Sequence, residues 1–221
     1  MQTFNHVFHN GVSASAYRWK NPDGSEGGIV AETAKIDPTA LIIQTAEVCP
    51  GARIGKRARI ARYVSIDNGA RIGSGTLIGE DASIGKDARI EEEASIGCGA
   101  NIGAGANIGY DVRIDSFARI GEAASIGDDA SIGGDARIGR YASIGADARI
   151  GAGACIGSGT RIGEDASIGE GASIGNGASI GVGASIGEGA SIGSFASIRE
   201  GACIGASSSI DAGASIDSDA R

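Results

Sequence analysis

The chain has 221 residues, of which 39 are glycine and only 4% are aromatic, a composition that does not suit an ordinary packed globular core. Its formal net charge of -8 provides neither the basic surface of a nucleic-acid-binding domain nor a long acidic tail. No apolar run approaches the roughly 20 residues of a membrane-spanning helix, and the N-terminus lacks the pattern of a secretion signal. We therefore expect a cytoplasmic protein whose partner is neither a membrane nor a nucleic acid.

The first 28 residues lie outside any repeat and predict a small β-hairpin cap over residues 1–28. Asn10-Gly11 stands between two runs of β-prone residues, 4–8 and 12–19, and favours a tight hairpin turn there. The segment contains the single tryptophan, so we expect it to cover the open apolar end of the first coil. The only two histidines, His6 and His9, would point to opposite faces of a strand. We interpret them as surface or cap residues, with a metal or catalytic pair as the alternative.

A period of six residues begins at Val30 and continues to Ile216, with Ile or Val at every sixth position. The residue two positions earlier is most often Ala, and the residue between them is often Ser or Arg. Because alternate side chains of a strand share a face, Ala and Ile point inward and Ser or Arg points to solvent. Gly follows the Ile in every repeat from Gly121 to Gly193, which indicates a turn where the backbone conformation or a close approach excludes a side chain.

Three such strand-and-turn units complete a coil of about 18 residues. Residues 29–221 therefore predict one all-β parallel β-helix (β-solenoid) of about ten coils, roughly 50 Å long at the usual strand spacing. The pattern over residues 30–221 resembles the hexapeptide-repeat left-handed β-helix superfamily, which includes trimeric acyltransferases and γ-class carbonic anhydrases. That resemblance implies a left-handed coil, although parallel crossovers generally favour the right-handed sense. The segment Gly27-Gly28-Ile29-Val30-Ala31, with Thr33-Ala34 after it, is also similar to the YdcK type of bacterial solenoid.

The enzymes of the superfamily use histidine as a general base or as a zinc ligand, and this chain has no histidine after His9. The repeat also lacks an inserted loop that would wall a pocket. Our leading hypothesis is therefore a non-catalytic structural or interaction protein without a cofactor. This rigid rod would associate with itself, side by side or end to end, or bind a protein partner. The alternative is an acyltransferase-like enzyme (hexapeptide transferase) with its site between subunits, trimeric as the resemblance implies.

Residues one coil apart lie above one another, so surface rows can be predicted from the sequence. One row is basic and is a candidate anion or partner face, with a merely solvated face as the alternative: Lys35, Arg53, Arg71 and Arg89. Four aromatic residues at turn positions are candidate interface anchors, with packing over the turn as the alternative: Tyr63, Phe117, Tyr141 and Phe195.

An acidic row and four cysteines complete the candidates. The acidic row recurs at one corner and indicates either turn-forming residues or a calcium site: Asp111, Asp129, Asp147 and Asp165. The cysteines are too far apart along the solenoid for disulfides and are predicted to be free thiols: Cys49, Cys98, Cys155 and Cys203. Their scatter predicts no metal site, and we expect no histidine close enough to activate a thiol.

Overall fold

The computed structural model describes residues 2–218, and within them there is no helix, including none that could span a membrane. Three longer strands come first: β1 (Phe4–Val7), β2 (Ser13–Lys20) and β3 (Glu26–Ala31). From β4 (Lys35–Ile36) to β34 (Ser215–Ile216) every strand has two residues, and successive strands in this series begin six residues apart. Residues 1 and 219–221 of the predicted cap and solenoid lie outside the described part.

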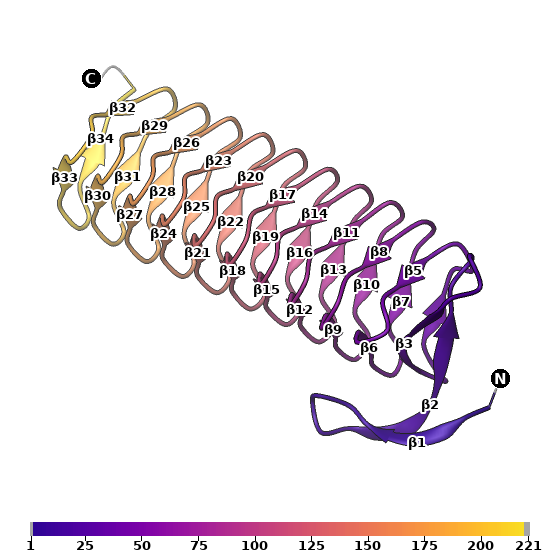
Figure 1. Ribbon diagram of the computed structural model, residues 1–221. Helices are drawn as coiled ribbons and strands as arrows, with labels where there is room; N and C mark the ends of the chain where they lie inside the picture. Colours follow the sequence, from indigo (N-terminus) through magenta and orange to yellow (C-terminus); the bar gives the residue numbers. More distant parts are fainter. Residues whose placement is uncertain (1, 219–221) are drawn as a thin grey trace.

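The strands form three parallel sheets that wind into one solenoid (Figure 1). Sheet A contains β3, β6, β9 and every third strand to β33, and β1 and β2 extend it. Sheet B runs from β4 to β34, and sheet C from β5 (Leu41–Ile42) to β32 (Cys203–Ile204). Each strand pairs with the equivalent strands of the coils before and after it, so that Ile72 lies between Ile54 and Ile90. The predicted left-handed parallel β-helix of about ten coils is confirmed.

The core follows the predicted alternation of side chains. Inward Ala and Ile residues are buried in every complete coil, as Ala70 and Ile72 illustrate, while Arg71 between them is exposed. Each buried Ile contributes roughly 2–3 kcal/mol of hydrophobic stabilisation, so the stacked rows oppose the loss of chain entropy without large aromatic residues. Threonine replaces the inward Ala at Thr76 and Thr160, where the hydroxyls donate hydrogen bonds to Gly73 O (3.0 Å) and Gly175 O (2.9 Å).

Most inward Ile residues are followed by a glycine, and this glycine is favoured by close approach and not by its backbone conformation. A Cβ on Gly145 would lie 2.5 Å from the backbone nitrogen of Glu164 in the next coil, and the φ angle of Gly145 is not in the left-handed region. The left-handed residue comes two positions later and is often not glycine, as at Asp147 (φ 57°). The sequence left two explanations open for this glycine, its backbone conformation and a close approach. The close approach of the next coil is the correct one.

The predicted hairpin is confirmed: β1 pairs with β2 in antiparallel fashion around a turn in which Gly11 N donates to Phe8 O at 2.8 Å. The strand β2 also pairs with β3, so the cap continues sheet A. Residue 28, the predicted boundary of the cap, falls inside β3. Trp19 packs into the main core, and its Nε1 donates a hydrogen bond to Ala40 O at 3.3 Å. The indole thereby covers the first coil, as the sequence suggested.

Candidate functional site

The basic row lies on four consecutive strands of sheet B, in register and exposed. Its members are Lys35 on β4, Arg53 on β7 (Arg53–Ile54), Arg71 on β10 (Arg71–Ile72) and Arg89 on β13 (Arg89–Ile90). This placement agrees with the predicted row. Its role as an anion or partner face remains a prediction.

The candidate aromatic residues occupy two corners of the solenoid. Tyr63 and Phe117 lie in the turns from sheet C to sheet A, and Tyr141 and Phe195 in the turns from sheet A to sheet B. All four are exposed, and all four adopt positive φ angles between 57° and 62°. A Cβ at Gly99 would lie 2.7 Å from the Phe117 ring, so this ring packs over the glycine of the coil before it. Packing over the turn and an interface role are therefore compatible.

The acidic row occupies the same left-handed turn position, at the corner from sheet B to sheet C. Its four aspartates have φ angles between 49° and 58°. Asp tolerates this conformation better than most residues, which favours the turn-forming interpretation of the row over a calcium site.

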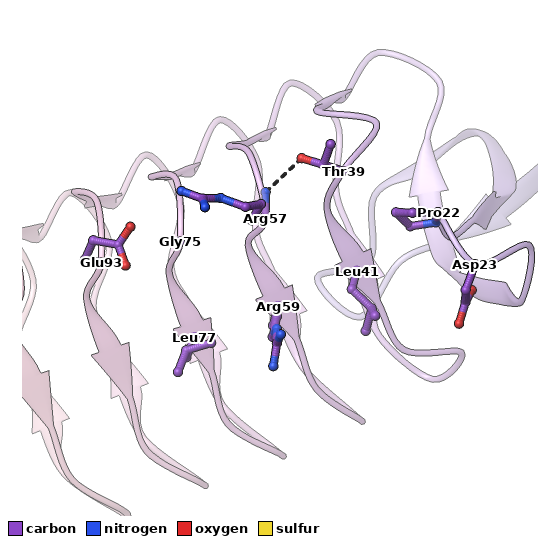
Figure 2. A pocket seen from close by; sticks show the side chains of 9 residues that line it. All are labelled: Pro22, Asp23, Thr39, Leu41, Arg57, Arg59, Gly75, Leu77 and Glu93. Atoms are coloured by element: carbon purple, nitrogen blue, oxygen red, sulfur yellow. Dashed lines mark hydrogen bonds between the residues drawn. The ribbon is translucent and has the colours of Figure 1, made fainter.

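A groove of about 550 Å³ lies further along this corner, towards the N-terminal end of the solenoid (Figure 2). Sheet C provides its floor through the outward side chains of Leu41, Arg59 and Leu77, from three consecutive strands. Arg57 and Glu93 come from the corner, and the Glu93 carboxylate lies against Gly75, in the space that a side chain at Gly75 would occupy. The backbone N–H of Arg57 donates to Thr39 Oγ1 at 3.0 Å, which holds the turn in place.

The turn between β2 and β3 forms one end of the groove through Pro22 and Asp23. The sequence predicts no pocket wall because the repeat lacks an inserted loop, and this expectation is wrong, since the cap contributes the wall. Hydrogen bonds from the hydroxyl (2.7 Å) and backbone N–H (2.9 Å) of Ser25 lower the pKa of Asp23. A sequence signal for this site existed: Leu41 and Leu77 replace the Ser or Arg that usually occupies the outward position.

A second group, the hairpin cluster, consists of His6, His9, Glu47, Cys49 and Asp67. His6 Nε2 lies 3.0 Å from Glu47 Oε1, and His9 Nδ1 lies 3.3 Å from Glu47 Oε2. The backbone N–H of His9 also donates to Glu47 Oε2 at 2.8 Å. The expectation that the two histidines face opposite ways is wrong, because β1 ends at Val7 and His9 belongs to the turn. Both imidazoles therefore reach the same carboxylate.

All four cysteines are free thiols, as predicted. The expectation that no histidine lies near a thiol is wrong, however, since Cys49 Sγ is 3.9 Å from His9 Nδ1. Burial, followed by the negative charges of Asp67 and Glu47, raises the pKa of Cys49 to about 12. Burial also acts to raise the pKa of Glu47, but hydrogen bonds from His9 and His6 outweigh it, and the pKa ends below its usual value.

Comparisons with known proteins relate the repeat to transferases. Residues 117–151 and 147–182 match the family model of the bacterial transferase hexapeptide (six repeats). LpxA from Acinetobacter baumannii is 17% identical, with 81% of this chain and 68% of that chain covered and a TM-score of 0.46. The UDP-N-acetylglucosamine acyltransferase of Arabidopsis is 19% identical, with 78% and 66% covered and a TM-score of 0.48. No curated protein matches the chain.

GDP-perosamine N-acetyl transferase from Caulobacter crescentus is 18% identical, with 55% of this chain and 49% of that chain covered and a TM-score of 0.40. The chain thus spans between about half and about two thirds of the length of these three proteins. With identities below 25% and TM-scores below 0.5, these similarities say nothing about the activity of this chain.

The leading hypothesis of a non-catalytic structural protein is contradicted, because the repeat matches a transferase family model. That hypothesis rested on a repeat without histidine and on the expected absence of a pocket wall. The alternative, an acyltransferase-like enzyme with its site between subunits, fits the findings better.

Proposed function

We propose that this protein, a member of the hexapeptide-repeat superfamily, is an acyltransferase-like enzyme that uses an acyl thioester with a phosphate-bearing carrier. The observation that carries the proposal is the groove in Figure 2, where two arginines lie beside two outward leucines. A phosphorylated thioester combines the same two chemistries, an anionic part and an apolar arm. The transferase match of the repeat supports this assignment.

The arginines of the groove suit phosphate. Within residues 2–218, neither Arg57 nor Arg59 forms an ion pair, so both guanidinium groups have free donors. A guanidinium binds phosphate through paired N–H donors and carries its charge at every physiological pH. The basic row begins around the same corner, on sheet B, and extends the positive surface. We therefore assign the phosphates to the corner and the acyl arm to Leu41 and Leu77.

The transfer also needs a group that accepts a proton. An amine or hydroxyl of the acceptor attacks the thioester carbonyl carbon, the carbon–sulfur bond breaks, and the carrier leaves as a thiolate. The proton that the acceptor loses passes to a base within hydrogen-bonding reach. Glu93 is our candidate base, because its carboxylate lies against Gly75 and lines the groove. The lowered pKa of Asp23 makes that carboxylate a weaker base.

A second copy of the chain would close the groove, which is open on its outer side. Tyr63 and Phe117 lie at the far corner of sheet C, and both are exposed. We propose that they anchor a homo-oligomer that packs on sheet C, so that the site lies between subunits. A cytoplasmic location belongs to the same proposal, since four free thiols suit a reducing compartment.

The test is the melting temperature of the full chain with and without millimolar acetyl-CoA. A ligand that binds only the folded state at about 100 times its Kd adds roughly 2.7 kcal/mol of stability, so a clear rise is expected. The rise should be lost in Arg59→Ser and kept in Arg137→Ser, an outward arginine of sheet A that serves as the matched control. No rise in the unmodified protein, or an equal rise in both variants, would count against the groove.

A further inference from the structure

The hairpin cluster brings three different metal-binding side chains together. His9 Nδ1, Cys49 Sγ and a carboxylate oxygen of Asp67 all lie within 4.8 Å of one another. The sulfur and nitrogen atoms are 3.9 Å apart. In a tetrahedral zinc site with bonds of about 2.0–2.3 Å, neighbouring ligand atoms lie roughly 3.3–3.9 Å apart, so small side-chain adjustments suffice.

The cluster is built where the chain departs from its own repeat. Cys49 and Asp67 occupy the first turn position of two successive coils, at the corner from sheet A to sheet B, where the regular repeat has Gly. Glu47 likewise occupies an outward position that is usually Ser or Arg. These departures coincide with the place where the hairpin covers the solenoid, and His9 comes from the hairpin itself.

We propose that the hairpin cluster is a zinc-binding site whose protein ligands are His9 Nδ1, Cys49 Sγ and a carboxylate oxygen of Asp67. Nitrogen, sulfur and oxygen donors together favour zinc over the harder magnesium and calcium ions. A thiolate and a carboxylate neutralise the two positive charges of the ion. The proposal is independent of the acyltransferase assignment.

Other residues of the cluster hold the ligands in place. Glu47 accepts the backbone N–H of His9 and thereby keeps the imidazole over Cys49, which makes Glu47 a positioning residue. The Asn10 amide donates hydrogen bonds to Asp67 Oδ1 and, at 3.3 Å, to Asn68 Oδ1. Metal binding would join the hairpin to two coils of the solenoid, because the ligands come from all three.

The electrostatics of the cluster favour a cation. The buried Cys49 sulfur lies near two carboxylates, Asp67 and Glu47. Their negative charges attract a positive ion to the sulfur. Zinc binds the thiolate and displaces its proton, so one proton should be released from Cys49 for each ion bound.

The test is a titration of the full chain, freed of metal by a chelator, with cobalt(II) and then with zinc(II). We expect one cobalt ion per chain, a thiolate-to-cobalt charge-transfer band and the strong visible bands of a tetrahedral site, all removed by zinc. Cys49→Ser should abolish the charge-transfer band, whereas Cys98→Ser, which replaces another free thiol, should leave it unchanged.

A second pair of variants introduces the Gly of the regular repeat at positions where the chain has Asp, so neither variant is expected to misfold. Asp67→Gly should weaken metal binding at least ~10-fold, and Asp211→Gly, at the same position of a distant coil, should leave it unchanged. Zinc should also raise the melting temperature of the unmodified protein more than that of Asp67→Gly. A charge-transfer band that persists in Cys49→Ser, or cobalt binding without any such band, would overturn the proposal.

Discussion

The close packing of successive coils predicts that Gly145→Ala is more destabilising than an alanine at a left-handed glycine. A Cβ at Gly145 would lie 2.5 Å from Glu164 N and 2.6 Å from Gly163 C, both of them backbone atoms that cannot rotate away. Ordinary contact needs at least about 3.4 Å, so the two coils must separate locally by roughly 0.9 Å. The hydrogen bond from Gly145 N to Ile162 O, 2.8 Å long, would then exceed normal hydrogen-bond length.

The expected cost is about 2–4 kcal/mol, which combines one or two weakened hydrogen bonds with the strain of overpacking. Gly159→Ala is the matched control: its φ of +67° is strained for alanine, but no atom lies within 4 Å of the added Cβ. That strain should cost only about 1–2 kcal/mol. Urea denaturation gives the total change in stability. Hydrogen exchange at the amides of Gly145 and Asp165, which bond between these two coils, gives the local change, since solenoids can unfold in parts.

An equal or smaller effect of Gly145→Ala would refute the reasoning, because it would mean that the coils separate freely. Fast exchange confined to residues around 145 and 165 would support it. Fast exchange spread evenly over the solenoid would instead indicate a general loss of stability.

Three further outcomes are expected. Lowering the pH through the folded-state pKa of Glu47 should loosen the hairpin. The folded-state pKa of this carboxyl lies below its unfolded value, so the carboxylate stabilises the fold fully above the unfolded pKa and loses that effect as the pH falls through the folded one. Hydrogen exchange in β1 would show this, and Glu47→Ser should remove the dependence. Alkylation at about pH 8, followed by mass spectrometry, should modify Cys98 long before Cys49, because Cys49 is buried and its pKa is about 12. Trp19→Ala should destabilise the first coil by about 3–5 kcal/mol, measured by urea denaturation, and a variant as stable as the original protein would contradict its role in the core.

The basic row, the groove and the hairpin cluster differ in how far they could be predicted from the sequence. The basic row followed directly from the spacing of Lys35 and its successors, because residues one coil apart must stack. The groove was indicated only weakly, by the leucines at outward positions. Its wall comes from a turn within the segment that the sequence predicted as a cap. The hairpin cluster was missed, since His9 and Cys49 are 40 residues apart and no period connects them.

The solenoid could be predicted from the amino-acid sequence, because each hexapeptide repeats the same inward Ala and Ile and the same turn, and repeated units of this kind stack on one another. The reason for the glycine after most of these Ile residues became clear only from the distance between coils. The contact between the hairpin and the solenoid could be seen only in the tertiary structure. Glu47, Cys49 and Asp67 meet the hairpin through side-chain contacts between distant segments, which local spacing does not encode.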